Sequence, residues 1–156
     1  MSAEDRNFLK GLDMADKLVR AAIRDGLKVT GLAVMSEAIQ GTPRIPHDEG
    51  TLESSGSVFV DDEFMAAADP AGGNPTPATS FNPGVSEDEP TMTVGFNTPY
   101  AAVQHEGHRA DGSHEIKNYT RTDGRGPKFL ERPLIEQAAK WLRILAERVR
   151  KGLAHA

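Results

Sequence analysis

The stretch from Thr91 to Gly107 limits what this chain can fold into more than any other part of it. Within residues 91–96, polar or small residues alternate with apolar ones, and this period of two predicts a strand buried on one face. Pro99 breaks the strand, and residues 100–106 are rich in helix formers and stop at Gly107. We therefore expect a strand, a tight corner and one short helix.

Apolar residues that recur at three- to four-residue steps predict a long N-terminal helix over residues 4–39. Gly26 and Gly31 each weaken a helix by about 1 kcal/mol relative to alanine. A kink or a split into two helices is therefore expected near Asp25 and Gly26. The segment 41–46, which contains two prolines, ends this helix.

A second apolar stripe predicts a helix at the C-terminal end of the chain. Pro133 suits the first turn of this helix, and Gly152 is expected to close it after a run of basic residues. Trp141 lies beside the stripe and is expected to belong to the core rather than to a ligand site. The stripe consists of Leu134, Ala138, Leu142, Leu145 and Val149.

The segments between the helices are predicted to form strands and loops. Residues 57–60 predict a strand with alternate side chains on opposite faces. Residues 66–90 are rich in proline and glycine and predict a long flexible β-hairpin loop. Residues 116–119 are a further candidate for a brief strand. The chain as a whole predicts a single α+β domain over residues 1–156, in which two helices pack on a small antiparallel sheet and a short helix follows the sheet.

The length and composition narrow the class of protein. At 156 residues the chain can bury a core as one domain. It has no cysteine, which excludes a disulfide framework and a cysteine-based zinc site. No apolar run approaches the length of a membrane span, and the polar N-terminus does not resemble a signal peptide. We expect a protein that acts inside a cell or in a particle assembled there, with no membrane partner.

Charge is distributed unevenly along the chain, whose net charge is −5. Residues 41–106 carry eleven acids against Arg44 alone, whereas residues 107–156 carry eleven bases against six acids. Such a chain has complementary flanks and could associate head to tail with copies of itself. The alternative is that both flanks are ordinary solvated surfaces. The acidic balance disfavours tight binding of nucleic acid.

The histidines near the short helix are the main candidates for chemistry. A helical zinc-protease motif needs histidines four residues apart, but His105 and His108 are three apart, with Gly107 between them. A metal site that adds His114 or Asp111 remains a weaker alternative. The chain also lacks a nucleophile elbow, a P-loop and a dinucleotide-binding glycine motif. Nothing in the sequence gives positive support for an enzyme, and we expect no cofactor and no metal.

Four segments, in this order, resemble the tail-completion or neck protein family of tailed bacteriophages, whose members are also described as head–tail connector or minor capsid proteins. The first is the long N-terminal helix with its proline-containing end. The second is Gly50-Thr-Leu-Glu-Ser-Ser55, the third is Thr98-Pro-Tyr-Ala-Ala-Val-Gln-His-Glu-Gly107, and the fourth is Pro127-Lys-Phe-Leu-Glu-Arg-Pro-Leu134. Lys128 departs from the family pattern by separating Pro127 from Phe129. The residues that match the motifs are Leu52, Ser55, Tyr100, Ala101, Glu106, Gly107, Pro127, Phe129, Leu130 and Pro133.

The resemblance implies a structural virion protein assembled in the bacterial host cytoplasm. Such a protein forms a homo-oligomeric ring, expected to hold six subunits, that joins the head-closure proteins to the tail. Its partners are other neck proteins and tail-tube or terminator proteins, and DNA only passes through the channel. The alternatives are a small metal-dependent hydrolase using His105 and His108, or a host adaptor domain. The charges expected at the bore or between subunits are Asp61, Asp62, Glu63, Glu87, Asp88, Glu89, Arg143, Arg148 and Arg150.

Overall fold

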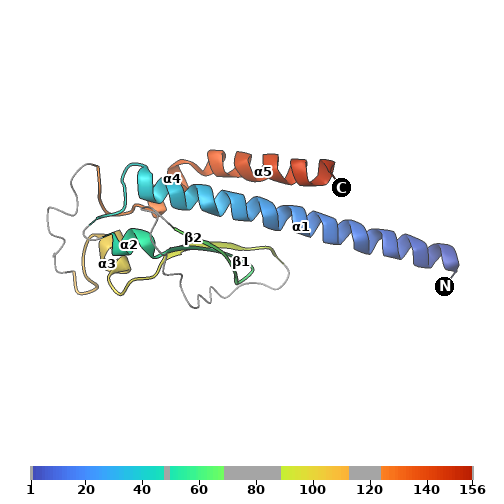
Figure 1. The fold of residues 1–156 in the computed structure, drawn as a ribbon, viewed down its shortest axis with the longest axis horizontal. Coiled ribbons are helices and arrows are strands. Elements are labelled where there is room, and N and C mark those ends of the chain that lie inside the picture. The colour runs from blue at the N-terminus through green and yellow to red at the C-terminus, as the bar shows by residue number, and fades with distance from the viewer. Residues whose placement is uncertain (1, 48–49, 69–88, 113–123, 156) are drawn as a thin grey trace.

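The computed structural model describes residues 2–47, 50–68, 89–112 and 124–155 (Figure 1). It confirms an α+β fold with a small antiparallel sheet, a long N-terminal helix, a C-terminal helix and a short helix after the sheet. The prediction that both long helices pack on the sheet is wrong for the C-terminal helix, which packs on the N-terminal one. The candidate strand at 116–119 and most of the predicted loop at 66–90 lie outside the described residues. The elements are α1 (Ala3–Gln40), α2 (Thr51–Ser54), β1 (Gly56–Val60), β2 (Glu63–Ala67), β3 (Met92–Phe96), α3 (Ala101–Glu106), α4 (Glu131–Glu136) and α5 (Ala138–Ala154).

Helix α1 is one continuous helix of 38 residues. It begins at a capping box, in which the Ser2 hydroxyl accepts a hydrogen bond from the Asp5 N–H and the Asp5 carboxylate accepts one from the Ser2 N–H. The predicted kink or split near Gly26 is wrong, because α5 packs directly on this glycine and supports the helix there. A Cβ on Gly26 would lie 2.8 Å from Leu145 Cδ1. Neither α1 nor another helix of the described residues is both long and apolar enough to cross a membrane.

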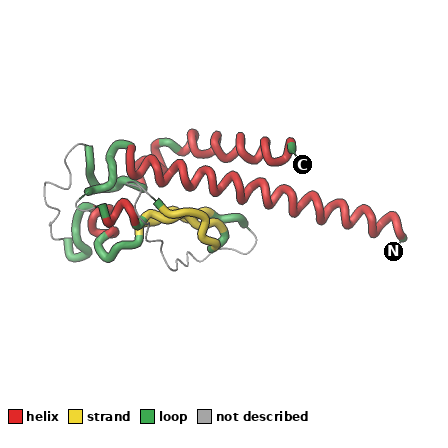
Figure 2. Tube along the Cα trace, in the orientation of Figure 1, coloured by secondary structure: helices red, strands yellow, loops and turns green. Residues whose placement is uncertain are grey.

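Helices α1 and α5 run antiparallel, and α1 lies between α5 and the sheet (Figure 2). Gly152, near the end of α5, packs against Ala22, and a Cβ on this glycine would lie 3.0 Å from Ala22 Cβ. The prediction that Gly152 closes the helix is therefore wrong. Its missing side chain permits close packing, and α5 continues to Ala154. The N-terminal part of α1 projects beyond the end of α5 (Figure 1). We call residues 3–20, which precede the α1 residues that contact α5, the overhang.

The predicted C-terminal stripe is only partly buried. A break at Gln137 separates α4 from α5, so residues before and after it do not share one helical face. Leu145 faces α1, but Leu142 is exposed. Trp141 is buried as predicted, and its indole N–H donates to the Pro133 carbonyl at 3.0 Å. The exposed members of the predicted stripe are Leu134, Ala138 and Leu142.

The sheet has the order β2-β1-β3, with both pairings antiparallel. The predicted strands at 57–60 and 91–96 are confirmed as β1 and β3, and Val58 lies opposite Val94 in the register. The apolar residues of β3 pack on a cluster formed by Met35, Val58 and Ala68. One face of the sheet is thus covered by α1, as the period of two predicts.

Strand β2 was not predicted from the sequence. Its presence changes both the bounds and the type of the loop predicted over residues 66–90. Asp61 and Asp62 have φ values of 50° and 63°, which form a tight hairpin turn between β1 and β2. Ala66 and Ala67, which the prediction placed in the loop, belong to β2. Both β2 and β3 pair with β1 rather than with each other. The segment that joins them is therefore not a hairpin loop, and that prediction is wrong.

Candidate functional site

The four segments that carry the family resemblance meet in one apolar cluster at the end of α1. Its buried members are Ala38, Ile45, Leu52 and Phe129. They come from the end of α1, the segment after it, α2 and the approach to α4. The partly buried residues packed against them are Ile39, Phe96, Ala101 and Leu130. We call these eight residues the motif core.

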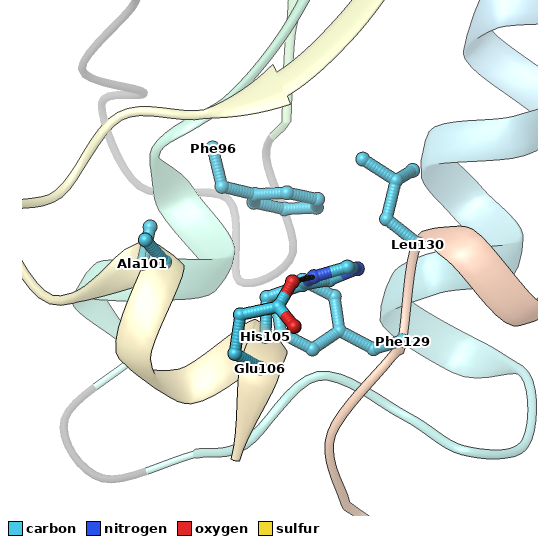
Figure 3. A pocket seen from close by; sticks show the side chains of 7 residues that line it. Phe96, Ala101, His105, Glu106, Phe129 and Leu130 are labelled. Atoms are coloured by element: carbon cyan, nitrogen blue, oxygen red, sulfur yellow. Dashed lines mark hydrogen bonds and ion pairs between the residues drawn. The ribbon is translucent and has the colours of Figure 1, made fainter. Parts of the chain in front are cut away.

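Phe129 lies at the centre of the motif core and is 1% exposed. Its ring makes edge-to-face contacts with Phe96, at a centroid distance of 5.5 Å, and with His105, at 5.0 Å. A hollow of about 290 Å³ opens beside these rings, bordered by Ala101, Glu106 and Leu130 (Figure 3). The aromatic contacts fix α3 and β3 against the segment that leads into α4.

Helix α3 positions two polar side chains at the rim of this hollow. The predicted stop at Gly107 is confirmed: this residue has φ 84°, and its N–H donates to the Val103 carbonyl at 2.9 Å. Tyr100 precedes the helix and is exposed. The cap ends the helix directly after His105 and Glu106, which leaves both side chains directed towards the approach to α4 (Figure 3).

Lys128 joins α3 to α4 through two carboxylates. Its ammonium group lies 2.7 Å from Glu106 Oε2 and 2.7 Å from Glu131 Oε2. Its backbone N–H donates to the His105 carbonyl at 2.7 Å. The hydrogen bond to Glu106 raises the pKa of Lys128, and the same bond lowers the pKa of Glu106. Both groups are therefore charged at neutral pH and act as a clamp, not as a proton donor and acceptor pair.

His105 bonds to the two acidic residues that Lys128 contacts. We call Lys128, Glu106, Glu131 and His105 the Lys128 clamp. Its Nε2 accepts a hydrogen bond from the Glu131 backbone N–H at 3.3 Å, and its Nδ1 lies 3.2 Å from Glu106 Oε1. These partners assign the proton to Nδ1, because Nε2 must present a lone pair. The ring thus links the end of α3 to the first turn of α4.

A metal could draw its ligands from this clamp. Within the described ranges, His105, Glu106 and Glu131 have ligand atoms within 4.8 Å of one another. The ammonium of Lys128 already lies against both carboxylates, the position in which a cation would bind. His108 does not join them, and its Nδ1 lies 3.0 Å from the Arg109 carbonyl oxygen. His114, predicted as a further ligand, lies outside the described residues.

A buried ion pair fastens the other side of the motif core. Arg125 Nη1 lies 2.6 Å from Glu53 Oε1 and donates to the Ile45 carbonyl at 2.7 Å. Glu53 is 7% exposed, and His47 Nδ1 lies 3.2 Å from the same carboxylate oxygen. Sequence reasoning missed this pair. The one available signal was that residues 41–106 contain a single base, so a buried acid there needs a base from another segment.

The remaining motif residues have structural contacts. The buried Ser55 donates its hydroxyl proton to the Leu52 carbonyl at 2.8 Å. Pro133 is buried in the first turn of α4, as predicted from the sequence. Pro127 is half-buried just before Lys128. Four motif residues, Leu52, Ala101, Phe129 and Leu130, therefore belong to the motif core, and Glu106 belongs to the ion-pair cluster beside it.

The charges predicted for a bore or a subunit contact fall into three groups. Arg24 on α1 pairs with Glu63 at 2.6 Å and with Asp61 at 3.5 Å, and Asp61 also accepts a hydrogen bond from the Thr91 N–H. Arg148 forms an ion pair with Asp25. The exposed residues that form no ion pair with another described residue are Asp62, Glu89, Arg143 and Arg150. Glu87 and Asp88 lie outside the described residues.

Comparison of the chain with protein-family models, with curated proteins and with solved structures returned no match.

Proposed function

We propose that this protein is a structural subunit of a tailed phage or a phage-like particle, and that copies of it form a ring in the neck between the head and the tail. The ring joins the head-closure proteins to the tail and lines the DNA channel. It is expected to hold six subunits and to be part of the virion after assembly in the bacterial cytoplasm. Other neck proteins and the tail-tube or terminator proteins are its expected partners.

The observation that carries this proposal is the convergence of the four motif segments in the motif core. Leu52, Ala101 and Phe129 come from segments far apart in the chain, yet they pack together. Motifs that define a family fold are expected to do so, because they specify its packing.

The polar residues around the motif core also fit a joining role. The Lys128 clamp and the Glu53–Arg125 pair are satisfied within the chain and hold loops and short helices together. A subunit of a ring needs loops and short helices that are held in fixed positions, because it must present the same surface to each neighbour. An acidic channel surface, to which Asp62 and Glu89 would contribute, would let DNA pass without adhering, since phosphate binding needs cations.

The test is self-association of the purified chain. At high protein concentration and low salt we expect a closed ring, and weaker association when salt screens the charges. The variant Arg143→Glu is expected to lower association, and Arg132→Glu in α4 is the charge-matched control. A chain that stays monomeric under these conditions, and is absent from particles when co-produced with neck and tail proteins, would contradict the proposal.

The metal-dependent hydrolase remains the alternative prediction. It requires a metal bound at His105, and the clamp geometry replaces the predicted His108 with Glu106 and Glu131. A zinc titration of the purified chain distinguishes the hydrolase from the structural subunit. Stoichiometric zinc that is lost in His105→Ala would favour the hydrolase, whereas a chain that folds and assembles identically with and without a chelator would favour the structural role.

A further inference from the structure

We infer that the overhang of one copy docks on the outer face of α5 in a second copy, and that this contact repeats from subunit to subunit. The inference rests on the self-assembly proposed above and adds the surfaces through which it occurs. It assigns a function to the one long element that extends past the rest of the described chain (Figure 1).

Among the described residues, no other element packs on the overhang. Every described side chain from Glu4 to Ala21 is exposed. Six large apolar side chains are among them, and Leu12 is 52% exposed. Ordinary monomers rarely expose several large apolar side chains together on one element, and such patches mark interaction sites. The six residues are Phe8, Leu9, Leu12, Met14, Leu18 and Val19.

The apolar stripe of the overhang continues an interface that already exists within the chain. Ala22 and Gly26 are the α1 residues on which the end of α5 packs. From Ala22 towards the N-terminus, steps of three and four residues lead along one helical face. This face is formed by Val19, Ala15, Leu12 and Phe8. The same side of α1 that binds α5 therefore extends beyond it, and none of the described helices covers it there.

The side of α5 that α1 leaves exposed offers a second apolar surface. Leu142 is 65% exposed and Leu153 is 40% exposed. They are eleven residues apart, about three turns, so both lie on the same side of the helix. The overhang spans 18 residues and α5 spans 17, so each is roughly 26 Å long at 1.5 Å per residue. The two helices are therefore of similar length.

Charge selects this pairing over an association of two overhangs. The edges of the overhang stripe carry Glu4 and Asp16, whereas the bases of the overhang lie on its other side. Two overhangs would bring acids together in one seam, which is unfavourable. The exposed surface of α5 has Arg143 and Arg150 at its edge, seven residues apart and without ion pairs to other described residues; with Glu147 between them, two bases stand against one acid. Acidic edges against these arginines form a complementary contact.

The two surfaces are different patches of one chain, so the contact is head to tail. Each copy uses its overhang on one neighbour and its α5 on the other. Such heterologous contacts close into a ring when the rotation between copies fits, as the proposed function requires.

Cysteine cross-linking tests the contact directly, because the chain has no native cysteine. Leu12→Cys and Leu142→Cys are prepared separately, mixed under conditions in which the wild type associates, and oxidised. We expect an intermolecular disulfide between the two variants. The control mixture contains Lys10→Cys instead of Leu12→Cys. Lys10 lies on the opposite side of the same helix, so much less product is expected.

A second variant measures the energetic role of the overhang. Leu12→Asp is expected to weaken association about 10-fold or more, the loss expected when one leucine is no longer buried. Its thermal melting should match that of the wild type, because Leu12 is exposed in the single chain. Met14→Asp serves as the matched control, because it adds the same charge at an exposed apolar residue on the opposite side of the helix from Leu12.

The outcomes separate this inference from the proposed function. If the wild type assembles but the cross-link forms equally with Lys10→Cys, or Leu12→Asp assembles as the wild type does, overhang docking is overturned and the ring proposal stands. Preferential linking of Leu12→Cys to itself also overturns it, in favour of paired overhangs. A wild type that remains monomeric overturns both.

Discussion

Gly31 of α1 lies so close to Val58 of β1 that a Cβ on the glycine would be 2.6 Å from Val58 Cγ1. The same Cβ would be 3.0 Å from Met92 Sδ of β3. This contact sets how near α1 lies to the sheet. We expect Gly31→Ala to destabilise the fold by about 1–3 kcal/mol, because the clash with the fully buried Val58 outweighs the gain in helix propensity. Denaturant unfolding measures the change.

Gly11 provides the control in the same helix. A Cβ on Gly11 meets nothing within 4 Å. Gly11→Ala should therefore show the helix propensity gain alone, up to about 1 kcal/mol of stabilisation. Two Gly→Ala changes in one helix with opposite signs would establish the packing of α1 on the sheet. The same sign in both variants would contradict it.

Phe129 is predicted to be the residue on which the motif core depends most. Phe129→Ala removes the edge-to-face contacts with Phe96 and His105 and leaves a cavity, with an expected loss of about 3–5 kcal/mol. Ile135→Ala is the control, since Ile135 is exposed in the single chain and should change stability by less than about 0.5 kcal/mol. Similar losses in both variants, measured by urea unfolding, would exclude a central role for Phe129.

The buried pair Glu53–Arg125 should respond strongly to the loss of one partner. Arg125→Met leaves the Glu53 carboxylate buried without its arginine, at an expected loss of about 3–5 kcal/mol. The exposed pair Arg132–Glu136 is the control, and Arg132→Met should lower stability by no more than about 0.5 kcal/mol. If Arg125→Met unfolds at the wild-type denaturant concentration, the ion pair does not secure the segments around the motif core.

Glu37 on α1 should make stability depend on pH. The hydrogen bond from Lys140, and then that from Gln137, lower the pKa of Glu37 below its ordinary value of 4.5. A lowered folded-state pKa gives stability that is present above the unfolded value and lost as pH falls through the folded value. The stability difference between the wild type and Glu37→Gln should therefore be full near pH 7 and shrink below about pH 4.5.

Unfolding curves of both proteins at several pH values measure this difference. Glu4→Gln is the control, because the exposed Glu4 has no ion pair with another described residue. A difference between the wild type and Glu37→Gln that stays constant down to about pH 3 would show that Glu37 does not contribute in this way.

Local sequence patterns were sufficient to predict an element where its contacts in the fold favour the same structure as the pattern does. The alternation in residues 91–96 predicts β3 because one face of that strand packs on α1. Gly107 predicts the end of α3 because its φ of 84° suits glycine. β2 could not be predicted this way, since Glu63–Ala67 has two alanines and little preference for a strand. It becomes a strand because the turn before it folds the chain back along β1.

Contacts between distant segments account for the other errors. Gly26 and Gly152 have weak helix propensity, yet the close α1–α5 packing that their missing side chains permit keeps both helices continuous. Leu142 lies in the same helix as Leu145 and Val149 but is exposed, because α1 covers only the side of α5 that carries Leu145 and Val149. The Glu53–Arg125 pair joins residues 72 positions apart. Local sequence patterns do not indicate which distant base pairs with a given acid.

The central claim is that this chain is a building block that assembles with copies of itself. The most direct test is the mass of the purified wild-type protein in solution at high concentration and low salt, together with images of the same sample. We expect a closed ring, with six copies as the expected number. A single chain that remains monomeric across the full concentration range would contradict the account.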